Sequence, residues 1–310
     1  MLNKKGKSFL GGAAFAAVLI LPAAAANGGW VVWPTKTYSA DAVRLDDIVG
    51  KLTVNVRNGG PVSVDVAGAK SRVEGIAVRE EDGKVVIDGS DEGENRSVWN
   101  WRNWFNFSSD FETRPDNLTI RVTVPRGAAV DVRDLVGDAT IGDTQGALHF
   151  EAAATRARIG RVGPAHITLG GAGRLDIAQV SGPLHLEVGG SGKVSVGPTQ
   201  SVNADIAGAG DAQFGAIAGG LSLDIAGSGN VSAASVNGPT HIDIAGSGSV
   251  KIADGTANPL HVDIMGAGNF IFGGVAVDPH IDAIGSGNVK LKSYRGHLDT
   301  EGMADVKIGE

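Results

Sequence analysis

The seven histidines of this chain share one pattern, because each stands two residues before an acidic residue or, in one case, a threonine. The pairs are His149 and Glu151, His166 and Thr168, His185 and Glu187, His241 and Asp243, His261 and Asp263, His280 and Asp282, and His297 and Asp299. Two further segments keep the acid, as Asp205 and Asp224, but carry Asn203 and Ser222 in the histidine position. Residues two apart on a β-strand point to the same side. The pattern therefore predicts a column of imidazoles beside a column of carboxylates on one outer face.

Three interpretations of these columns remain open. The groups can pair with one another and so reduce the repulsion between like charges stacked about 5 Å apart. They can bind a divalent metal, since imidazole and carboxylate suit zinc or copper, although a regular ladder spaces its ligands instead of converging them. They can also act in pH-dependent adhesion, because protonated histidine would neutralise an acidic face at about pH 6. The candidate metal-binding or pH-sensing residues are His241, Asp243, His261, Asp263, His280 and Asp282.

A second candidate site is a cluster of aromatic residues within the polar segment 89–117. Its members are Trp99, Trp101, Trp104, Phe105 and Phe107. Exposed aromatic rings are suited to stacking on a glycan, to a lipid interface or to a protein contact. Alternatively, the segment folds back and covers unpaired strand edges.

The elements that must position these residues follow from a repeated Gly-Ala/Ser-Gly triplet. Its first glycine recurs at intervals of 18 to 20 residues, at Gly171, Gly190, Gly208, Gly227, Gly246, Gly266 and Gly285. Apolar and polar residues alternate on both sides of each triplet, which indicates two short strands per unit. Such a period is typical of a solenoid. The pattern predicts an all-β solenoid with coils of about 19 residues and glycine at sharp, closely stacked corners.

Stacking of these coils places two apolar columns in the core. The first is Ile167, Leu186, Ala204, Leu223, Ile242, Val262 and Ile281, and the second is Leu169, Val188, Ile206, Ile225, Ile244, Ile264 and Ala283. We expect regular coils over residues 134–310. Residues 38–133 contain strands with less regular turns, and we interpret them as irregular opening coils, with a separate small β-domain as the alternative.

The amino end has the features of a secretory signal peptide over residues 1–26. Three lysines precede an apolar run from Phe9 to Leu21, and small residues follow before Asn27. We expect a short linker over 27–37 and no membrane-spanning segment in the mature chain, which would be periplasmic or extracellular. The chain has no cysteine and a net charge of −7, which argues against a thiol site and against nucleic acid as a partner.

The strands, the segment EEDGKVVIDG, the segment LTIRVTVP and the ladder of GSGN and GAGN corners together resemble the bacterial head GIN domain family of putative autotransporter adhesins. The resemblance covers about residues 37–310 and implies a right-handed β-helix of the cell envelope. It implies no catalytic residues. The chain departs from the family in having no lipobox cysteine, and we expect no carboxyl-terminal membrane barrel.

We therefore expect a secreted, non-enzymatic scaffold with adhesin-like binding to an envelope or extracellular glycan or protein, and it could form a homo-oligomer. We expect no cofactor apart from a divalent metal on the histidine and aspartate columns. The alternatives are a polysaccharide-active β-helix enzyme and a metal-responsive or pH-responsive surface protein.

Overall fold

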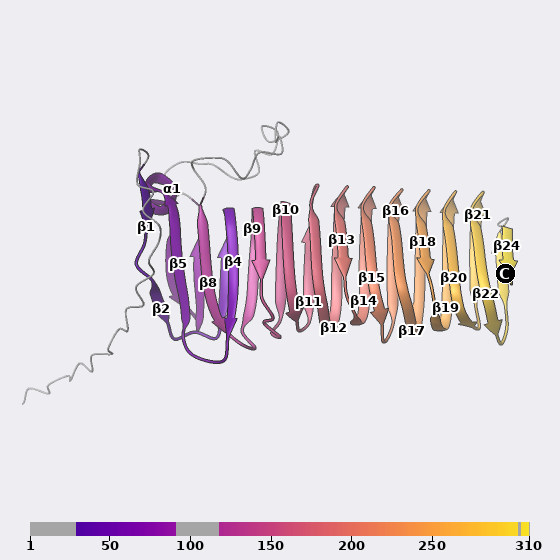
Figure 1. Cartoon of the computed structure of the whole chain (residues 1–310). Coiled ribbons are helices and arrows are strands. Elements are labelled where there is room, and N and C mark those ends of the chain that lie inside the picture. Colours follow the sequence, from indigo (N-terminus) through magenta and orange to yellow (C-terminus); the bar gives the residue numbers. More distant parts are fainter. Residues whose placement is uncertain (1–28, 91–117, 303–304, 310) are drawn as a thin grey trace, which may run out of the picture.

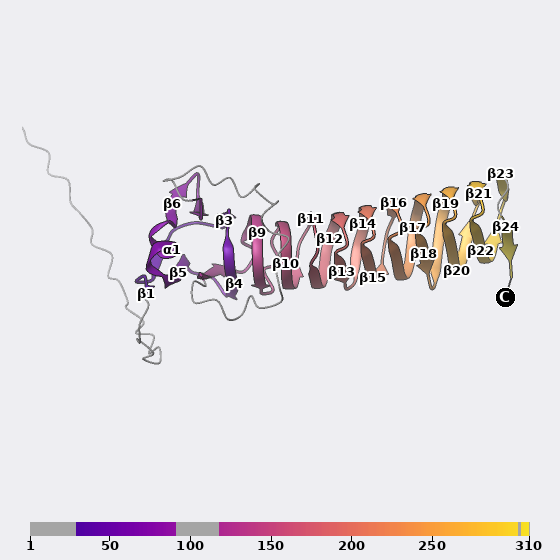
Figure 2. The same ribbon diagram turned by 90° about the horizontal axis from the view of Figure 1, so that it is seen from above.

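Alternating residues on both sides of each glycine triplet give every coil two strand faces. The computed structural model describes residues 29–90, 118–302 and 305–309, and it confirms the predicted β-solenoid. The coils stack along one axis into a rod, with the amino-terminal strands at one end and the carboxyl-terminal strands at the other (Figures 1 and 2). Equivalent strands of successive coils pair in parallel, so each coil completes the hydrogen bonds of its neighbours.

The face that carries the histidine and acid positions is called the histidine face. It contains β3 (Ala42–Asp46), β7 (Lys84–Asp88), β11 (Ala165–Leu169), β14 (Thr199–Gly208), β16 (Leu221–Gly227), β19 (Gly255–Gly266), β21 (His280–Gly285) and β23 (Asp299–Gly302). The second face, called the groove face, contains β4 (Val49–Arg57), β8 (Thr119–Pro125), β13 (Lys193–Val196), β15 (Asp211–Ile217), β18 (Ser249–Ile252), β20 (Asn269–Val277), β22 (Asn288–Arg295) and β24 (Asp305–Ile308). Four longer strands bend round a corner and contribute to both faces: β9 (Ala129–Ile141), β10 (Leu148–Val162), β12 (Arg174–Gly190) and β17 (Asn230–Gly246).

The two predicted apolar columns form the core of the histidine face. All seven residues from Ile167 to Ile281 in the first column have no measurable exposure, and those of the second column are at most 3 % exposed. Phe150, Phe270 and Phe272 add the largest buried side chains. Because the side-chain period of a strand is two, burial of these columns places the alternating histidines and acids on the outside.

The glycine corners bring backbone against backbone. Six of the seven triplet glycines, from Gly190 to Gly285, have a φ between +111° and +133°, a region that favours glycine. At Gly246 an added Cβ would collide with the carbonyl oxygen of Gly227 in the preceding coil. Gly171 lies at the same corner without a positive φ.

Near the amino end the spatial order of the coils differs from their order in the sequence. β3 pairs in parallel with both β7 and β9, and β4 pairs in parallel with both β8 and β9. The coil made by β3 and β4 therefore lies between the β7–β8 coil and the β9 coil. These strands share one continuous sheet with the regular coils.

An antiparallel group covers this end of the rod. β5 (Val62–Ala69) pairs antiparallel with β8, β1 (Trp30–Val32) and β2 (Lys36–Tyr38), and β6 (Ala77–Glu81) pairs antiparallel with β7. The expectation of a linker over 27–37 is thus wrong for the described residues from 29 onward, because Trp30–Val32 and Lys36–Tyr38 add strands to the sheet. The alternation in this region is too short to indicate a strand by itself.

One short helix, α1 (Lys70–Glu74), follows β5 and lies at the same end (Figure 1). Within the part of the chain that the structure describes, no helix has the length and apolar character needed to cross a bilayer. The predicted signal peptide lies outside the described residues.

Candidate functional site

The predicted imidazole column is present in two stretches on the histidine face. His149, His166 and His185 lie opposite one another in successive coils, and the column continues through Asn203 and Ser222. It resumes at His241, His261 and His280. In the first stretch neighbouring rings stack, with centroids 5.0 Å and 4.6 Å apart and interplanar angles of 11° and 25°. In the second stretch the rings are tilted by 55° to 56°.

The placement of the seventh histidine in this column is wrong. Asp299 lies opposite His280, and its Oδ2 accepts a hydrogen bond from His280 Nδ1 at 3.0 Å. His297 lies in the connection that precedes β23, where its backbone nitrogen donates to Asp278. The pairing differs by two residues from the one that the His-x-Asp pattern predicts. Because a shift of two keeps every residue on the same face, the alternation of apolar and polar residues cannot detect it.

The acid column is longer and more continuous than the imidazole column. Seven carboxylates occupy successive coils, namely Glu187, Asp205, Asp224, Asp243, Asp263, Asp282 and Glu301. Partial burial and the carboxylate of Asp243 raise the pKa of Asp224, and partial burial and the carboxylate of Asp224 raise that of Asp205. Like charges directly opposite one another in a sheet are destabilising. The column is therefore an acidic surface in which the middle members Asp205 and Asp224 have raised pKa values.

Of the six predicted metal or pH-sensing residues, the structure brings three together. His241, Asp243 and Asp263 each offer one donor atom, and these atoms lie within 4.8 Å of one another. His241 Nε2 also donates to Asp243 Oδ2 at 3.1 Å. His261, His280 and Asp282 lie in the same two columns but outside this cluster.

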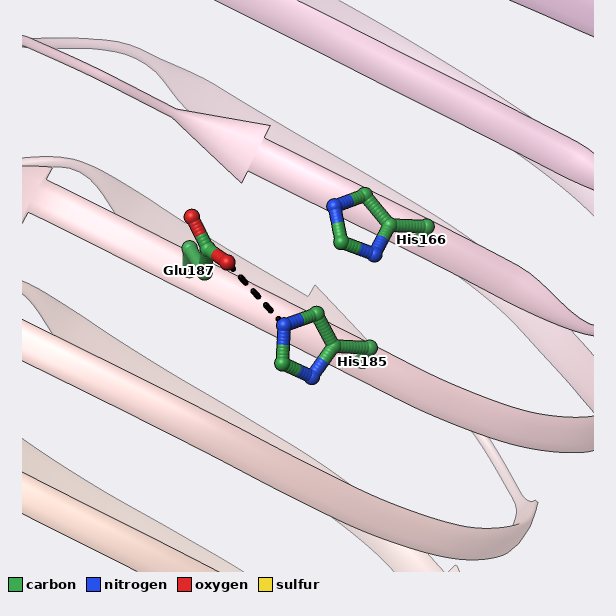
Figure 3. Close-up of side chains that lie close together, drawn as sticks. All are labelled: His166, His185 and Glu187. Carbon is green, nitrogen blue, oxygen red and sulfur yellow. Dashed lines mark hydrogen bonds and ion pairs between the residues drawn. The ribbon is translucent and has the colours of Figure 1, made fainter.

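A second cluster lies in the first stretch of imidazoles. It contains His166 of β11 with His185 and Glu187 of β12, whose donor atoms also lie within 4.8 Å of one another. Figure 3 shows the two rings side by side and Glu187 beside His185, whose Nε2 donates to Glu187 Oε1 at 3.0 Å. The sequence places these residues in the columns but does not single them out as ligands. The signal that could have found them is a run of histidines in adjacent coils that ends at His185 and is followed by Asn203 in the next coil.

The environment of His166 favours neutral imidazole. Partial burial and the neighbouring rings of His185 and His149 lower the pKa of His166, and this outweighs the opposite effect of Glu187 and Glu151. A neutral ring keeps a lone pair available for a metal ion or a hydrogen-bond donor.

A groove runs beside this cluster on the histidine face. Its volume is about 730 Å³. His149, His166 and His185 line one part of it together with Pro164 and Pro183, and Asp131 and Arg133 of β9 are further lining residues. The groove thus combines an apolar floor with imidazoles and a salt bridge, in which Arg133 Nη2 lies 3.0 Å from Asp131 Oδ2.

A smaller groove on the other face has a volume of about 540 Å³. Two in-register columns line it across five coils: Arg174, Lys193, Asp211, Asn230 and Ser249 in the first, and Asp176, Ser195, Gln213, Ser232 and Lys251 in the second. Asp211 accepts a hydrogen bond from Asn230 at 3.1 Å and lies 3.4 Å from Lys193 Nζ. These contacts hold the pKa of Asp211 below its usual value. Sequence reasoning missed this groove, because its members are ordinary surface residues until stacking aligns them.

The predicted aromatic binding residues, Trp99, Trp101, Trp104, Phe105 and Phe107, lie outside the described residues. The grooves and clusters above all belong to described coils.

The sequence of the amino-terminal and first regular coils matches a known family. Residues 47–218 match the model of a family described as "Putative auto-transporter adhesin, head GIN domain". The chain belongs to this family. No curated protein matches the sequence.

Solved structures similar to this family member are also known. A putative lipid binding protein from Parabacteroides distasonis is 15 % identical with a TM-score of 0.43, covering 91 % of this chain and 97 % of that one. A putative adhesin from the same species is 12 % identical with a TM-score of 0.43, covering 91 % and 98 %. A putative adhesin from Bacteroides fragilis is 15 % identical with a TM-score of 0.37, covering 90 % and 97 %. Likeness at this level carries no information on a ligand.

Proposed function

We propose that this family member is an exported, non-enzymatic scaffold that binds an envelope or extracellular glycan through the groove of the groove face. The observation that carries the proposal is the lining of that groove by two aligned columns of amide, hydroxyl, carboxylate and cationic side chains. Sugar hydroxyls both donate and accept hydrogen bonds. Two columns that contain both donors and acceptors are therefore suited to a linear saccharide lying along the rod.

The coils support the proposed absence of catalysis. Glycoside hydrolysis requires a pair of carboxylates on opposite sides of the scissile bond. In the groove, Asp176 and Asp211 belong to different columns and different coils, and Asp211 is paired with Lys193 and Asn230. Because Asp211 is already paired, the charged residues of the groove are better suited to binding a ligand than to cleaving it. Export is supported by the sequence of residues 1–26 and by the adhesin family.

A glycan array probed with the mature chain, residues 27–310, tests the proposal. We expect retention of at least one class of envelope or extracellular polysaccharide and no new reducing or unsaturated ends after incubation. Asn230→Ala in the groove should weaken retention. Asn237→Ala is the matched control, because Asn237 lies on the same strand, β17, and is exposed outside the groove. Equal loss in both variants, or release of new sugar ends, would contradict the proposal.

A further inference from the structure

We propose that His166, His185 and Glu187 bind a divalent transition-metal ion of the zinc class. The site lies on the histidine face and is independent of the glycan groove on the other face. It differs from the residues that the sequence singles out for metal binding, because its two imidazoles come from the first stretch of the column.

Backbone pairing brings the donors together. His166 lies directly opposite His185, and Thr168 lies opposite Glu187, in the parallel pairing of β11 with β12. The two rings are 4.6 Å apart between centroids. Because the ladder fixes both backbones, the three side chains start close together before any ion arrives.

The donor set suits zinc. Two imidazole nitrogens and one carboxylate oxygen form the protein part of known open zinc sites, which keep a further position for water. Tetrahedral bonds of about 2.0–2.2 Å place ligand atoms roughly 3.3–3.5 Å apart. His185 Nε2 and Glu187 Oε1 are 3.0 Å apart, and no pair in the cluster exceeds 4.8 Å. The side chains of His185 and Glu187 are 33 % and 47 % exposed. Small rotations of these side chains can therefore bring the three donor atoms to the distances that tetrahedral coordination needs.

Asn203 provides a partner for the other nitrogen of His185. Its Nδ2 lies 3.2 Å from His185 Nδ1. When Nε2 of a histidine binds metal, Nδ1 carries the proton and needs an acceptor. A half-turn of the Asn203 amide presents Oδ1 to that proton, and such amide orientations are set by the hydrogen-bond network. Asn203 can therefore hold the ring of His185 in both the free and the metal-bound state.

The charge around this site also favours it over the cluster of His241, Asp243 and Asp263. Thr168 occupies the acid position beside His166, so Glu187 has no carboxylate opposite it on that side. His241, Asp243 and Asp263 contain only one imidazole and lie within the continuous acid column, where Asp243 also interacts with Asp224. The groove of about 730 Å³ that His166 and His185 line gives an ion and its water access from solvent.

Calorimetric titration of the metal-free mature chain with Zn²⁺ tests the site. We expect one site per chain, with affinity lowered roughly tenfold or more by His185→Ala and by Glu187→Gln. His297→Ala is the matched control, because His297 is exposed and lies outside the column. It should leave the affinity unchanged. Circular dichroism verifies that each variant keeps its β-structure.

A measurement on the unaltered protein keeps the test independent of variant folding. In NMR spectra of the seven imidazoles, Zn²⁺ should shift the signals of His166 and His185 first. The proposal is overturned if Zn²⁺ does not bind, if other imidazoles shift while these two do not, or if Asp263→Asn removes the binding that His185→Ala leaves intact. Equal weakening by His297→Ala would show general surface binding and would overturn it too.

Discussion

At the scale of the residue, the acid column shows how stacking changes the chemistry of an ordinary aspartate. A carboxylate at the same position in every coil lies about one strand spacing from the carboxylates of the two neighbouring coils. Partial burial and Asp243 raise the pKa of Asp224. A carboxyl whose pKa is raised by folding stabilises the folded state when protonated. That contribution is complete below the unfolded pKa and is lost as the pH rises through the raised value.

The first prediction follows from this sign. Asp224→Asn removes one charge from the column and should raise both the thermal midpoint and the free energy of unfolding at pH 7. The gain in free energy should be at most about 1 kcal/mol, because the group is partly solvated. The advantage should shrink as the pH falls and nearly vanish at about pH 3, which is below the ordinary aspartate pKa of about 3.9, because most aspartates are then protonated in both states. Scanning calorimetry from pH 3 to pH 8 measures it. Asp41→Asn, at an exposed position away from the column, is the control, and a similar gain there would refute the column as the cause.

Two buried threonines supply the second prediction. Thr199 Oγ1 has no hydrogen-bond partner within the described part of the chain, whereas Thr240 Oγ1 donates to the carbonyl of Gly238 at 3.2 Å. Both side chains are almost completely buried. An unsatisfied buried hydroxyl costs about 1–3 kcal/mol, and a satisfied one contributes about 1 kcal/mol.

Thr199→Val should therefore increase the free energy of unfolding by about 1 kcal/mol, and Thr240→Val should decrease it by about the same amount. Chemical denaturation of the two variants beside the unaltered chain measures the difference. Changes of the same sign in both variants would mean that side-chain shape, and not hydrogen bonding, decides stability at these positions.

At the scale of the element, the corner is where the coil is most sensitive to substitution. Gly246 has a φ of +131°, and a Cβ there would meet the carbonyl oxygen of Gly227. Gly83 has a φ of +73°, but a Cβ there would have open space around it. Substitutions at Gly246 and Gly83 therefore distinguish the energetic cost of backbone strain from that of the close approach of two coils.

The third prediction is that Gly246→Ala costs roughly 2–4 kcal/mol, because strain and collision add. Gly83→Ala should cost about 1 kcal/mol, from strain alone. Urea unfolding followed by circular dichroism measures both. If Gly246→Ala and Gly83→Ala lower the free energy of unfolding equally, the neighbouring coil can move aside without an energetic penalty. Close stacking would then not explain the glycine at this corner.

At the scale of the whole molecule, the two ends of the rod differ. β5, β1, β2 and α1 cover the amino end. At the other end β23 and β24 each pair with a strand of the preceding coil, and no described strand pairs with their outer edge. In a solenoid each coil contacts only its neighbours, so an open end loses contacts that inner coils keep.

The fourth prediction concerns this asymmetry. Amide hydrogen exchange in the mature chain should be fastest in β23 and β24 and slowest in the middle coils from β12 to β17, because local opening needs less free energy at an uncovered end. Mass spectrometry of peptic fragments measures the gradient. Uniform protection along the rod would contradict it and would indicate either global cooperativity or a cover on the carboxyl end, such as a second copy.

Much of the fold could be predicted from the sequence because the same pattern of residues recurs in every regular coil. The triplet glycines, the alternation around them and the two apolar columns specify a coil, its corner and its core. Period-two alternation also fixes which residues face outward, so the imidazole and acid columns could be assigned to the surface. Each of these is a local property that neighbouring residues express together.

What only the tertiary structure decided depends on pairing between segments. The alternation of apolar and polar residues does not distinguish two registers that differ by two residues. It therefore could not predict that Asp299, and not His297, lies opposite His280. The order of the first coils, with β3 and β4 between β7–β8 and β9, depends on which strand edges meet. The convergence of His166, His185 and Glu187 depends on side-chain directions within a ladder. Composition and period determine the coil, whereas the contacts between coils determine which of its outward residues can act together, because those contacts join residues about 19 positions apart.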